Sequence, residues 1–290
     1  MHELTSPQEM RAWSRAERAR NRRIGFVPTM GFLHEGHLRL VDRARERSDR
    51  VVLSIFVNPL QFGPNEDLAQ YPQDLERDRR LAAARGVDCL FVPDVAAMYP
   101  TEPLVRVHPG PMGDTLEGAA RPGHFAGVLT VVAKLFHYVE PDIAIFGRKD
   151  FQQAMLVQRM ARDLDFGVEI DVAPTVRELD GLALSSRNTY LKGDDRRAAL
   201  ALSRALRAVE QAWRNGEADP KALQRRGLEV LRAPDVRPEY LELVDDQLRP
   251  VARADARTVV VLAARVGPAR LIDNVVLGEG IASDVAVRTS

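Results

Sequence analysis

Cysteine and lysine are both scarce in this sequence, and each scarcity limits what the chain can do. Cys89 is the only cysteine among 290 residues, so no disulfide can form within the chain, and its apolar surroundings predict a buried thiol. A chain without disulfides suits a reducing compartment, so we expect a cytoplasmic protein. Only four of the 41 basic residues are lysines. A lysine inside a motif is therefore informative, because a compact ammonium and a planar guanidinium are not interchangeable.

The sequence also lacks a net charge and long apolar runs. Lys+Arg and Asp+Glu number 41 each, so no uniform field would attract nucleic acid or an anionic membrane. No apolar run approaches the ~20 residues that span a bilayer, and the charged N-terminus lacks the apolar core of a signal peptide. We therefore expect neither nucleic-acid nor membrane partners. Any anionic ligand must be held by a local site.

Short apolar segments alternate with helical segments over residues 1–176. The expected strands are 24–27, 51–57, 88–92, 143–146 and 168–172, and the expected helices are 37–47, 72–85, 125–138 and 150–163. Apolar strands that alternate with helices predict an α/β fold, with a Rossmann-like parallel sheet covered on both faces. In such sheets, ligands bind beyond the carboxyl ends of the strands.

The pattern changes in the last third of the chain. Apolar residues recur at helical spacing in 202–213, and a second helix is expected at 221–231. Strands are then expected at 240–244, 258–263 and 270–276, with Pro, Asp and Gly turns between them. Helices followed by a strand meander predict a smaller α+β C-terminal domain over 177–290.

A histidine pair follows the first predicted strand and opens the next helix. His34 and His37 are three residues apart, so they share one helical face. A helix N-terminus presents unpaired N–H groups and the positive end of the helix dipole, which suits phosphate. Imidazolium donors there would stabilise charge that moves onto pyrophosphate. A surface or capping pair is the plainer alternative.

Other sites built on this segment fit less well. The spacing His-x-x-His is one residue shorter than that of the His-Glu-x-x-His zinc motif. Neither the Gly-x-Gly-x-x-Gly dinucleotide pattern nor the Walker A pattern follows the strand. Zinc-protease, dehydrogenase and P-loop functions are therefore disfavoured.

Two further polar segments stand where predicted strands end. Asn58 and Gln61 follow the second strand, and both side chains can donate and accept hydrogen bonds, which suits a substrate with hydroxyls and a carboxylate. Lys149 lies between a strand end and a helix start, where it could neutralise phosphate, and Asp150 could cap the helix. Taken singly, each segment could equally be an ordinary turn.

A third polar segment, 177–191, lies at the predicted domain boundary. Ser185, Ser186 and Arg187 would supply hydroxyl and guanidinium donors for phosphate oxygens. In isolation, the segment would be interpreted as a turn rich in small polar residues.

Together, in this order and at these separations, the four segments resemble the pantothenate synthetase family along residues 24–191. The form His-x-Gly-His is similar to the HIGH signature of the nucleotidyltransferase superfamily. The resemblance implies a Rossmann-like domain that binds nucleotide and pantoate, followed by a C-terminal domain that closes over the site. It also implies ATP-dependent condensation of pantoate with β-alanine to pantothenate, AMP and pyrophosphate through a pantoyl-adenylate, in a homodimer.

The resemblance assigns catalytic and nucleotide-binding roles. It implies that His34, His37 and Lys149 act in catalysis, with His37 as the proton donor. The ATP-binding set that it implies comprises Met30, Gly31, His34, His37, Gly147, Lys149, Asp150, Val176, Leu184, Ser185, Ser186 and Arg187.

The resemblance also implies a substrate pocket, a metal and a gate. Gln61, Gln153 and Asn58 would bind pantoate, and Gln61 would also face β-alanine. A Mg²⁺ ion would bridge phosphate oxygens, with Asp78 as the candidate on the protein side. The Gly- and Pro-rich segment 109–124 would be a gate that keeps water off the adenylate, or else a plain surface crossover.

One position departs from the family's pattern, and two other functions compete. Arg148 stands where we expect glutamate, so the ion pairing around Lys149 is in doubt. A nucleotidyltransferase that acts on a phosphate ester would share the histidine motif, but Gln61 and Gln153 favour an organic acid. A non-enzymatic nucleotide sensor would not need the complete set of histidines and lysine.

Overall fold

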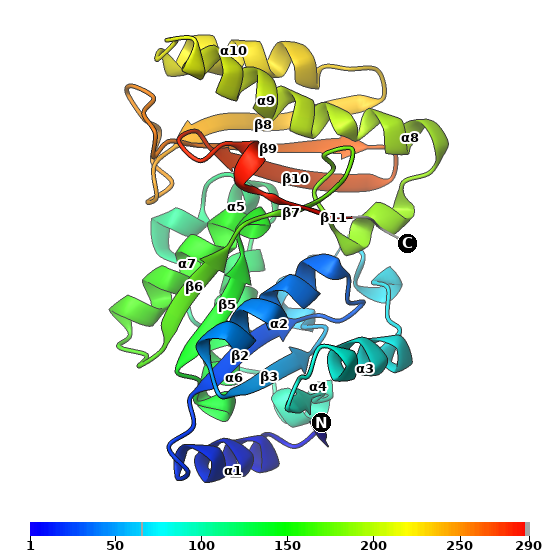
Figure 1. The fold of residues 1–290 in the computed structure, drawn as a ribbon, viewed down its shortest axis with the longest axis vertical. Coiled ribbons are helices and arrows are strands. Elements are labelled where there is room, and N and C mark those ends of the chain that lie inside the picture. The colour runs from blue at the N-terminus through cyan, green and yellow to red at the C-terminus, as the bar shows by residue number, and fades with distance from the viewer. Residues whose placement is uncertain (65, 288–290) are drawn as a thin grey trace. The chain divides into compact units, whose positions relative to one another are not determined.

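The chain folds into two compact units, which the computed structural model describes for residues 1–64 and 66–287 (Figure 1). The N-terminal unit comprises Met1–Gly147 and Gln152–Ala173. The C-terminal unit comprises the chain from Pro174 onward and, in addition, Arg148–Phe151. The sequence predicts a single boundary after residue 176. In the structure, the chain passes from one unit to the other three times, after Gly147, after Phe151 and after Ala173.

The N-terminal unit is built on a six-stranded sheet in the order β1-β4-β3-β2-β5-β6, and all its strand pairs are parallel. The predicted Rossmann-like sheet is therefore confirmed. Its strands are β1 (His2–Leu4), β2 (Ile24–Thr29), β3 (Arg50–Ile55), β4 (Cys89–Phe91), β5 (Ile143–Gly147) and β6 (Glu169–Ala173).

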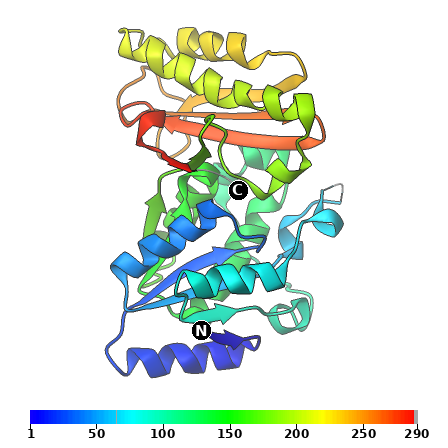
Figure 2. The ribbon, with the colours of Figure 1, turned by 45° about the vertical axis from the view of Figure 1, so that its right-hand side comes forward.

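Helices cover both faces of this sheet because successive strand residues point to opposite sides. Phe26 packs in one core with residues of α1, α6 and α7, whereas its neighbour Val27 packs in another core with residues of α2 and α3. Figure 1 and Figure 2 show α2 and α3 in front of the sheet. Cys89 is fully buried in the first core, as its apolar surroundings predict. The helices of this unit are α1 (Pro7–Arg18), α2 (Glu35–Arg47), α3 (Leu75–Ala84), α4 (Val95–Met98), α5 (Glu117–Ala120), α6 (His124–Val139) and α7 (Phe151–Asp163).

The direction of winding reverses at the boundary between β2 and β5. The chain proceeds from β2 to β3 and β4 on one side, and then returns to place β5 on the other side of β2, with Gly25 opposite Ile143 and Phe26 opposite Ala144. In open α/β sheets, such a switch point leaves a crevice beyond the carboxyl ends of the strands. The segment after β2 and the end of β5 therefore lie at the edge of the sheet where ligands bind.

The C-terminal unit is an antiparallel sheet covered by two helices. Strands β8 (Val236–Val244), β9 (Val259–Val266) and β10 (Ala269–Val276) form the sheet in the order β10-β9-β8. Helices α9 (Leu200–Arg214) and α10 (Pro220–Leu231) pack against it around Leu202, Leu206 and Val209. The unit also contains α8 (Gly193–Ala198) and a parallel pair of short strands, β7 (Val176–Glu178) and β11 (Val285–Val287). The predicted α+β class of this region is confirmed.

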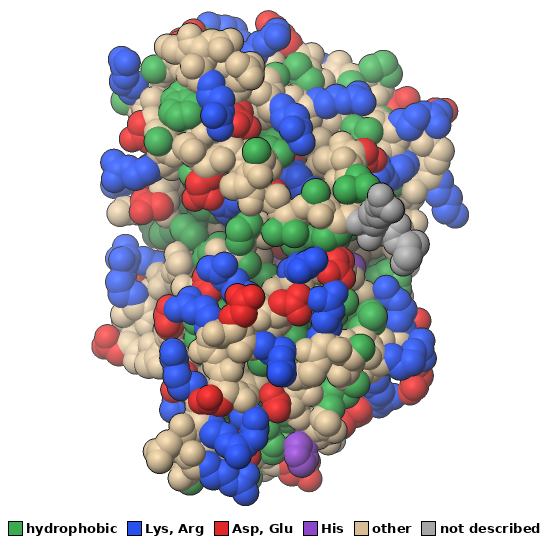
Figure 3. All heavy atoms as spheres, viewed as in Figure 1, with side chains coloured by type: hydrophobic (Ala, Val, Ile, Leu, Met, Phe, Trp, Pro, Cys, Tyr) green, Lys and Arg blue, Asp and Glu red, His purple; other side chains and the backbone are tan. Residues whose placement is uncertain are grey.

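Some elements were not expected from the sequence. Strand β1 and helix α1 were not among the expected elements, and Met10 of α1 is fully buried against the sheet. The segment 109–124, which has no periodicity, forms the 3₁₀ turn Gly110–Gly113 and the short helix α5. Basic and acidic side chains are interspersed on the face shown in Figure 3, as expected for zero net charge.

Candidate functional site at the carboxyl edge of the sheet

The segment after β2 turns sharply before α2 begins. Gly31 has φ = +84°, and a Cβ atom at this position would stand 2.8 Å from Cγ2 of Ile55 and 3.0 Å from Oδ2 of Asp78. A side chain here would therefore meet both an unfavourable backbone conformation and a direct clash. The N–H of Gly31 donates to Oγ1 of Thr29 at 3.1 Å. Glycine thus allows the chain to fold back so that Leu33 and His34 lead into α2.

Asp78 of α3 fixes this turn. Its side chain is 1% exposed, and its two oxygens accept the N–H groups of Phe32 and Leu33, each at 2.7 Å. Burial raises the pKa of Asp78, and these two backbone N–H donors oppose the rise. The structure therefore gives Asp78 a clear role as the acceptor that holds the turn, and its role as a magnesium ligand stays a prediction.

The structure brings His34 and His37 together at the N-terminus of α2. Their rings are stacked with centroids 4.0 Å apart, and the N–H of His34 donates to Nδ1 of His37 at 3.4 Å. The two side chains form a capping box, in which the His34 side chain accepts the N–H of His37 and the His37 side chain accepts the N–H of His34. The pair therefore caps α2, and both imidazoles lie at the positive dipole end of a helix at the switch point of the sheet. Such a position favours a phosphate ligand.

Asn58 and Gln61 form one buried hydrogen-bonded pair after β3. Nδ2 of Asn58 donates to Oε1 of Gln61 at 3.0 Å and to the carbonyl of Gly127 at 3.1 Å, while Oδ1 accepts from the hydroxyl of Tyr99 at 2.9 Å. Nε2 of Gln61 lies 3.2 Å from Sδ of Met30, in the turn after β2. Asn58 is 1% exposed and Gln61 8%. Asn58 therefore orients Gln61, and Gln61 lies next to the histidine segment.

His124, at the start of α6, supports the same region and was not singled out from the sequence. Its Nδ1 lies 2.8 Å from the carbonyl of Gln61, and its Nε2 lies 3.0 Å from Nη1 of Arg121, which also pairs with Glu66 at 2.6 Å. Burial, together with the neighbouring Arg121, lowers the pKa of His124 to about 4. A lone histidine after glycine gives no sequence signal, because the carbonyl that it contacts belongs to Gln61, 63 positions earlier in the chain.

A cavity of about 390 Å³ opens at the carboxyl ends of β2, β3 and β4. Met30, Gly31 and Asp78 line it together with apolar side chains such as Ile55 and Phe56. A mostly apolar cavity with a few polar groups is typical of small-molecule sites. Three of the residues predicted from the sequence therefore meet at one hollow in the N-terminal unit.

The end of β5 and the start of α7 contribute Gly147 and Gln153 to the N-terminal unit. Gly147 pairs with Ala173 at the end of the sheet, and Gln153 is half-buried in the first turn of α7. The neighbouring Gln152, which the sequence did not single out, is 5% exposed. It donates to the carbonyls of Met112 and Thr115 at 2.8 and 2.9 Å, and thereby holds the segment 109–124.

The remaining predicted ATP-binding residues belong to the C-terminal unit. Val176 and Leu184 lie in a small apolar cluster, and the N–H of Leu184 donates to the carbonyl of Val176 at 2.9 Å. Ser185 precedes a 3₁₀ turn, Ser186–Tyr190, and its Oγ accepts from the N–H of Arg187 at 3.3 Å. Lys149 and Asp150 stand in another 3₁₀ turn, Arg148–Asp150. Ser185, Ser186 and Arg187 are thus adjacent in one turn, and Lys149 stands in the same unit.

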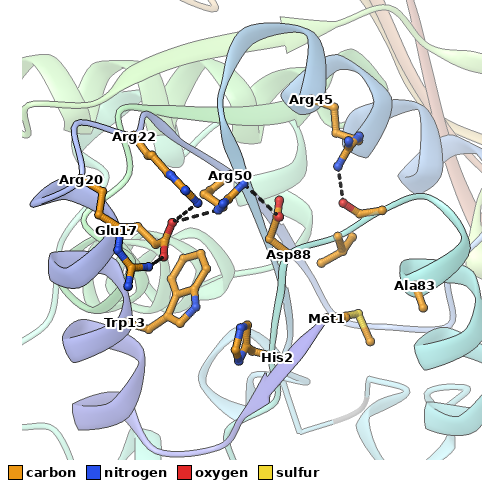
Figure 4. A pocket seen from close by; sticks show the side chains of 12 residues that line it. Met1, His2, Trp13, Glu17, Arg20, Arg22, Arg45, Arg50, Ala83 and Asp88 are labelled. Carbon is orange, nitrogen blue, oxygen red and sulfur yellow. Dashed lines mark hydrogen bonds and ion pairs between the residues drawn. The ribbon is translucent and has the colours of Figure 1, made fainter.

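A second cavity, of about 530 Å³, contains none of the predicted site residues. Arginines surround it, but Glu17 of α1 is buried among them and accepts from Arg20 at 2.6 Å, Arg22 at 3.0 Å and Arg50 at 2.8 Å (Figure 4). Asp88 lies 3.5 Å from Arg50 on the other side. The arginines around this cavity are therefore paired with carboxylates of the chain, and these ion pairs join α1 to β3.

The described part of the chain, residues 1–64 and 66–287, has neither a cluster of metal-binding side chains nor an apolar helix of membrane-spanning length. It contains no group of three or more His, Cys, Asp or Glu side chains placed to hold a metal ion. Within the same residues, no helix combines the length and the apolar character that a bilayer crossing requires.

Comparison with known proteins gives one consistent match. The family model described as pantoate-beta-alanine ligase matches residues 2–276. The pantothenate synthetase of Pelotomaculum thermopropionicum is 51% identical over 273 residues, covering 93% of this chain and 97% of that protein.

Solved structures agree with this match. The pantothenate synthetase of Thermus thermophilus superposes with a TM-score of 0.91 at 49% identity, over 96% of this chain and 99% of that one. The pantoate-beta-alanine ligase of Francisella tularensis, solved in complex with beta-gamma ATP and beta-alanine, gives a TM-score of 0.81 at 34% identity, over 97% and 99% of the two chains. Since the family model and these relatives cover nearly the whole chain, this protein belongs to the pantoate–β-alanine ligase family and is a ligase.

Proposed function

We propose that this ligase condenses pantoate with β-alanine at the expense of ATP, and that it forms pantothenate, AMP and pyrophosphate through a pantoyl-adenylate. The observation that carries the proposal is the stacked pair His34 and His37 at the N-terminus of α2, at the switch point of the sheet. Membership of the family supports the choice of substrates over the phosphate ester of a nucleotidyltransferase. It also argues against a nucleotide sensor without turnover.

The proposed chemistry consists of two displacements. An oxygen of the pantoate carboxylate attacks the α-phosphorus of ATP, and the bond from that phosphorus to the bridging oxygen of pyrophosphate breaks. The amine of β-alanine then attacks the acyl carbon of the adenylate, loses a proton and expels AMP. Adenylation is needed because a free carboxylate is a poor acyl donor, whereas AMP is a good leaving group.

On the N-terminal unit, we assign His34 and His37 to the phosphates that leave as pyrophosphate. Their position beside the helix N-terminus provides donors where negative charge accumulates during adenylation. Gln61, oriented by Asn58, would bind pantoate together with Gln153, and Gln61 would also face β-alanine. Neutral amides can bind hydroxyl and carboxylate groups of a substrate without altering the charge of the site.

On the C-terminal unit, we assign Lys149, Ser185, Ser186 and Arg187 to ATP phosphates. Ammonium, hydroxyl and guanidinium groups are the donors that phosphate oxygens accept most readily. Val176 and Leu184, which form a buried apolar cluster next to these serines, would face the adenine. The remaining members of the proposed ATP-binding set are Met30, Gly31, Gly147 and Asp150.

Mg²⁺ is proposed to bridge phosphate oxygens of ATP, with Asp78 as the candidate ligand on the protein side. Asp78 uses both carboxylate oxygens for the N–H groups of Phe32 and Leu33, so it would offer an incoming ion only its remaining lone pairs. Mg²⁺ commonly keeps several waters and takes its other ligands from substrate phosphates.

The assembly and the compartment are further parts of the proposal. We propose a homodimer in the cytoplasm, without nucleic-acid or membrane partners. Leu104 and Val105 are 94% and 87% exposed, which is unusual for large apolar side chains that follow one another. Light scattering of the wild type and of a Leu104→Asp, Val105→Asp variant would measure the subunit number. A wild type that is monomeric at micromolar concentration would refute the dimer.

The function is tested by measuring pyrophosphate, AMP and pantothenate with the purified protein. We expect pyrophosphate release to require ATP and pantoate, and AMP to appear in proportion to pantothenate once β-alanine is added. Pyrophosphate release with a phosphate ester, but never with pantoate, would instead establish the nucleotidyltransferase. Binding of ATP without any release would establish the sensor.

A further inference from the structure

Lys149 is attached to the C-terminal unit, although it lies in sequence between β5 and α7 of the N-terminal unit. The link is the side chain of Asn274 on β10, which is 2% exposed. Its Nδ2 donates to the carbonyl of Arg148 at 2.9 Å and to the carbonyl of Lys149 at 3.0 Å. One buried amide group therefore holds two consecutive peptide units of the turn on which Lys149 stands.

The side chain of Arg148 makes a second link. It is buried, and its Nη2 donates to Asp284 at 2.9 Å and to Ser283 at 3.3 Å, while its Nη1 pairs with Glu279. The guanidinium group thereby ties the turn to the segment that precedes β11. This pairing gives a reason for the arginine at a position where the family's pattern leads us to expect glutamate. A glutamate here would face Asp284 and Glu279 with a like charge.

Arg177 of β7 completes the buried network. It is 3% exposed and bonds Asp284 at 2.7 Å and Asp273, the residue before Asn274, at 2.7 and 2.9 Å. Two guanidinium groups thus share two buried carboxylates, and the buried charges balance. Removing one partner of such a set is costly, because the others are left buried and uncompensated. The network therefore restricts where the turn Arg148–Asp150 can lie relative to β10.

Strand β10 supports the second phosphate-binding segment as well. The turn Ser186–Tyr190 packs on β10, as does the turn Arg148–Asp150. Lys149 and the pair Ser186 and Arg187 consequently stand on two turns that pack on the same strand, although 37 positions separate Lys149 from Ser186 in the chain. The histidines and Gln61, by contrast, belong to the N-terminal unit.

We propose that Asn274 and Arg148 are positioning residues, which set Lys149 on the framework of β10 so that it acts on ATP phosphates together with Ser186 and Arg187. The inference rests on the proposed function, because it takes the role of Lys149 from there. It adds that the lysine is attached to the C-terminal unit, and that this sequence achieves the attachment with its own Arg148–Asp284 pair. Neither positioning side chain needs to touch substrate.

The test is steady-state kinetics of Asn274→Ala and Arg148→Gln, with ATP and pantoate varied separately. We expect kcat to fall by ~10-fold or more, because a displacement of about 1 Å can cost ~10²-fold in rate. The KM for pantoate should stay within about twofold, since Gln61 and Gln153 stand on the other unit. Matched controls are Asn215→Ala and Arg249→Gln, which remove exposed side chains of the same unit and should match the wild type.

A double-mutant cycle with Lys149→Ala separates positioning from a general loss of structure. If Asn274 acts through Lys149, Asn274→Ala should lower kcat much less in the Lys149→Ala background than in the wild type. Should Arg148→Gln fail to fold, Arg148→Lys keeps a positive charge opposite Asp284 and serves for the same cycle. Full additivity, or folded variants with wild-type kcat, would overturn the inference. A wild type that makes no pantothenate would instead overturn the proposed function.

Discussion

Asn58 donates a hydrogen bond to Gln61 at 3.0 Å, and both side chains are buried. The same Asn58 amide binds the carbonyl of Gly127, where a Cβ atom would come within 2.2 Å of the carbonyl of Leu60. The glycine therefore lets α6 approach the turn after β3, and the asparagine joins the two. The orientation of Gln61 is a result of this packing and not of its own position in the chain.

Asn58→Ala should therefore weaken both the fold and substrate binding. The substitution leaves the carbonyl of Gly127 and the hydroxyl of Tyr99 without this partner, which costs about 1–3 kcal/mol of unfolding free energy. We also expect the KM for pantoate to rise, though less than in Gln61→Ala. Urea unfolding and initial-rate kinetics measure the two effects. An unchanged KM in a folded Asn58→Ala variant would contradict the orienting role.

His37→Ala and Lys149→Ala should each lower kcat by ~10²–10³, as expected when a donor to developing charge is removed. Lys149→Ala should leave the thermal unfolding midpoint near that of the wild type, whereas His37→Ala removes one side chain of the capping box of α2 and should lower the midpoint slightly. His137→Ala and Lys221→Ala remove exposed residues of the same types and are the controls. Wild-type rates in both site variants would refute the assigned roles.

Asp78→Asn tests whether this carboxylate holds the turn or a metal. An asparagine can accept one of the two N–H groups of Phe32 and Leu33 but presents an amide donor to the other, so we expect a loss of about 1–3 kcal/mol of stability. The loss should be the same with and without Mg²⁺. Asp74→Asn, at the exposed N-cap of α3, should be nearly neutral because asparagine caps equally well. A loss seen solely when Mg²⁺ is present would favour a metal role.

Acidification should destabilise the protein through His124 before most carboxylates titrate. The folded state lowers the pKa of His124 from 6.5 to about 4, so in this interval the unfolded chain binds a proton that the folded chain does not. The contribution of neutral His124 to the free energy of unfolding is therefore fully present above pH 6.5 and is lost as the pH falls towards 4. Between pH 7.5 and pH 5.0 this loss amounts to about 2 kcal/mol.

The measurement is urea unfolding at pH 7.5, 6.0 and 5.0. We expect His124→Gln to be less stable than the wild type at pH 7.5, with a flatter dependence on pH. His137→Gln, which changes an exposed histidine, should keep the wild-type slope. A wild-type slope in His124→Gln would assign the acid sensitivity to another group.

The sequence by itself determined the class of each unit, because apolar periodicity is a property of neighbouring residues and can be recognised without knowing any tertiary contact. The strands near 24–29 and 143–147 and the helices near 200–214 and 220–231 all follow from that periodicity. The motif around His34 and His37 was equally local, since the glycine turn and the helix start are adjacent in the chain. Helix α1 escaped prediction although its start signals are local, since Ser6 caps it and Pro7 is its first residue. Strand β1 has only three residues, and its pairing with β4 joins segments far apart in the chain.

Tertiary structure alone decided which groups support the predicted site. Asp78 binds a turn some 45 positions earlier, His124 binds Gln61 across 63 positions, and Arg148 binds Asp284 across 136 positions. Hydrogen bonds and ion pairs depend on distance and direction in space, and the spacing of residues in a sequence carries neither. For the same reason, the sequence placed Lys149 with the first domain, whereas its buried hydrogen bonds to Asn274 attach it to the second.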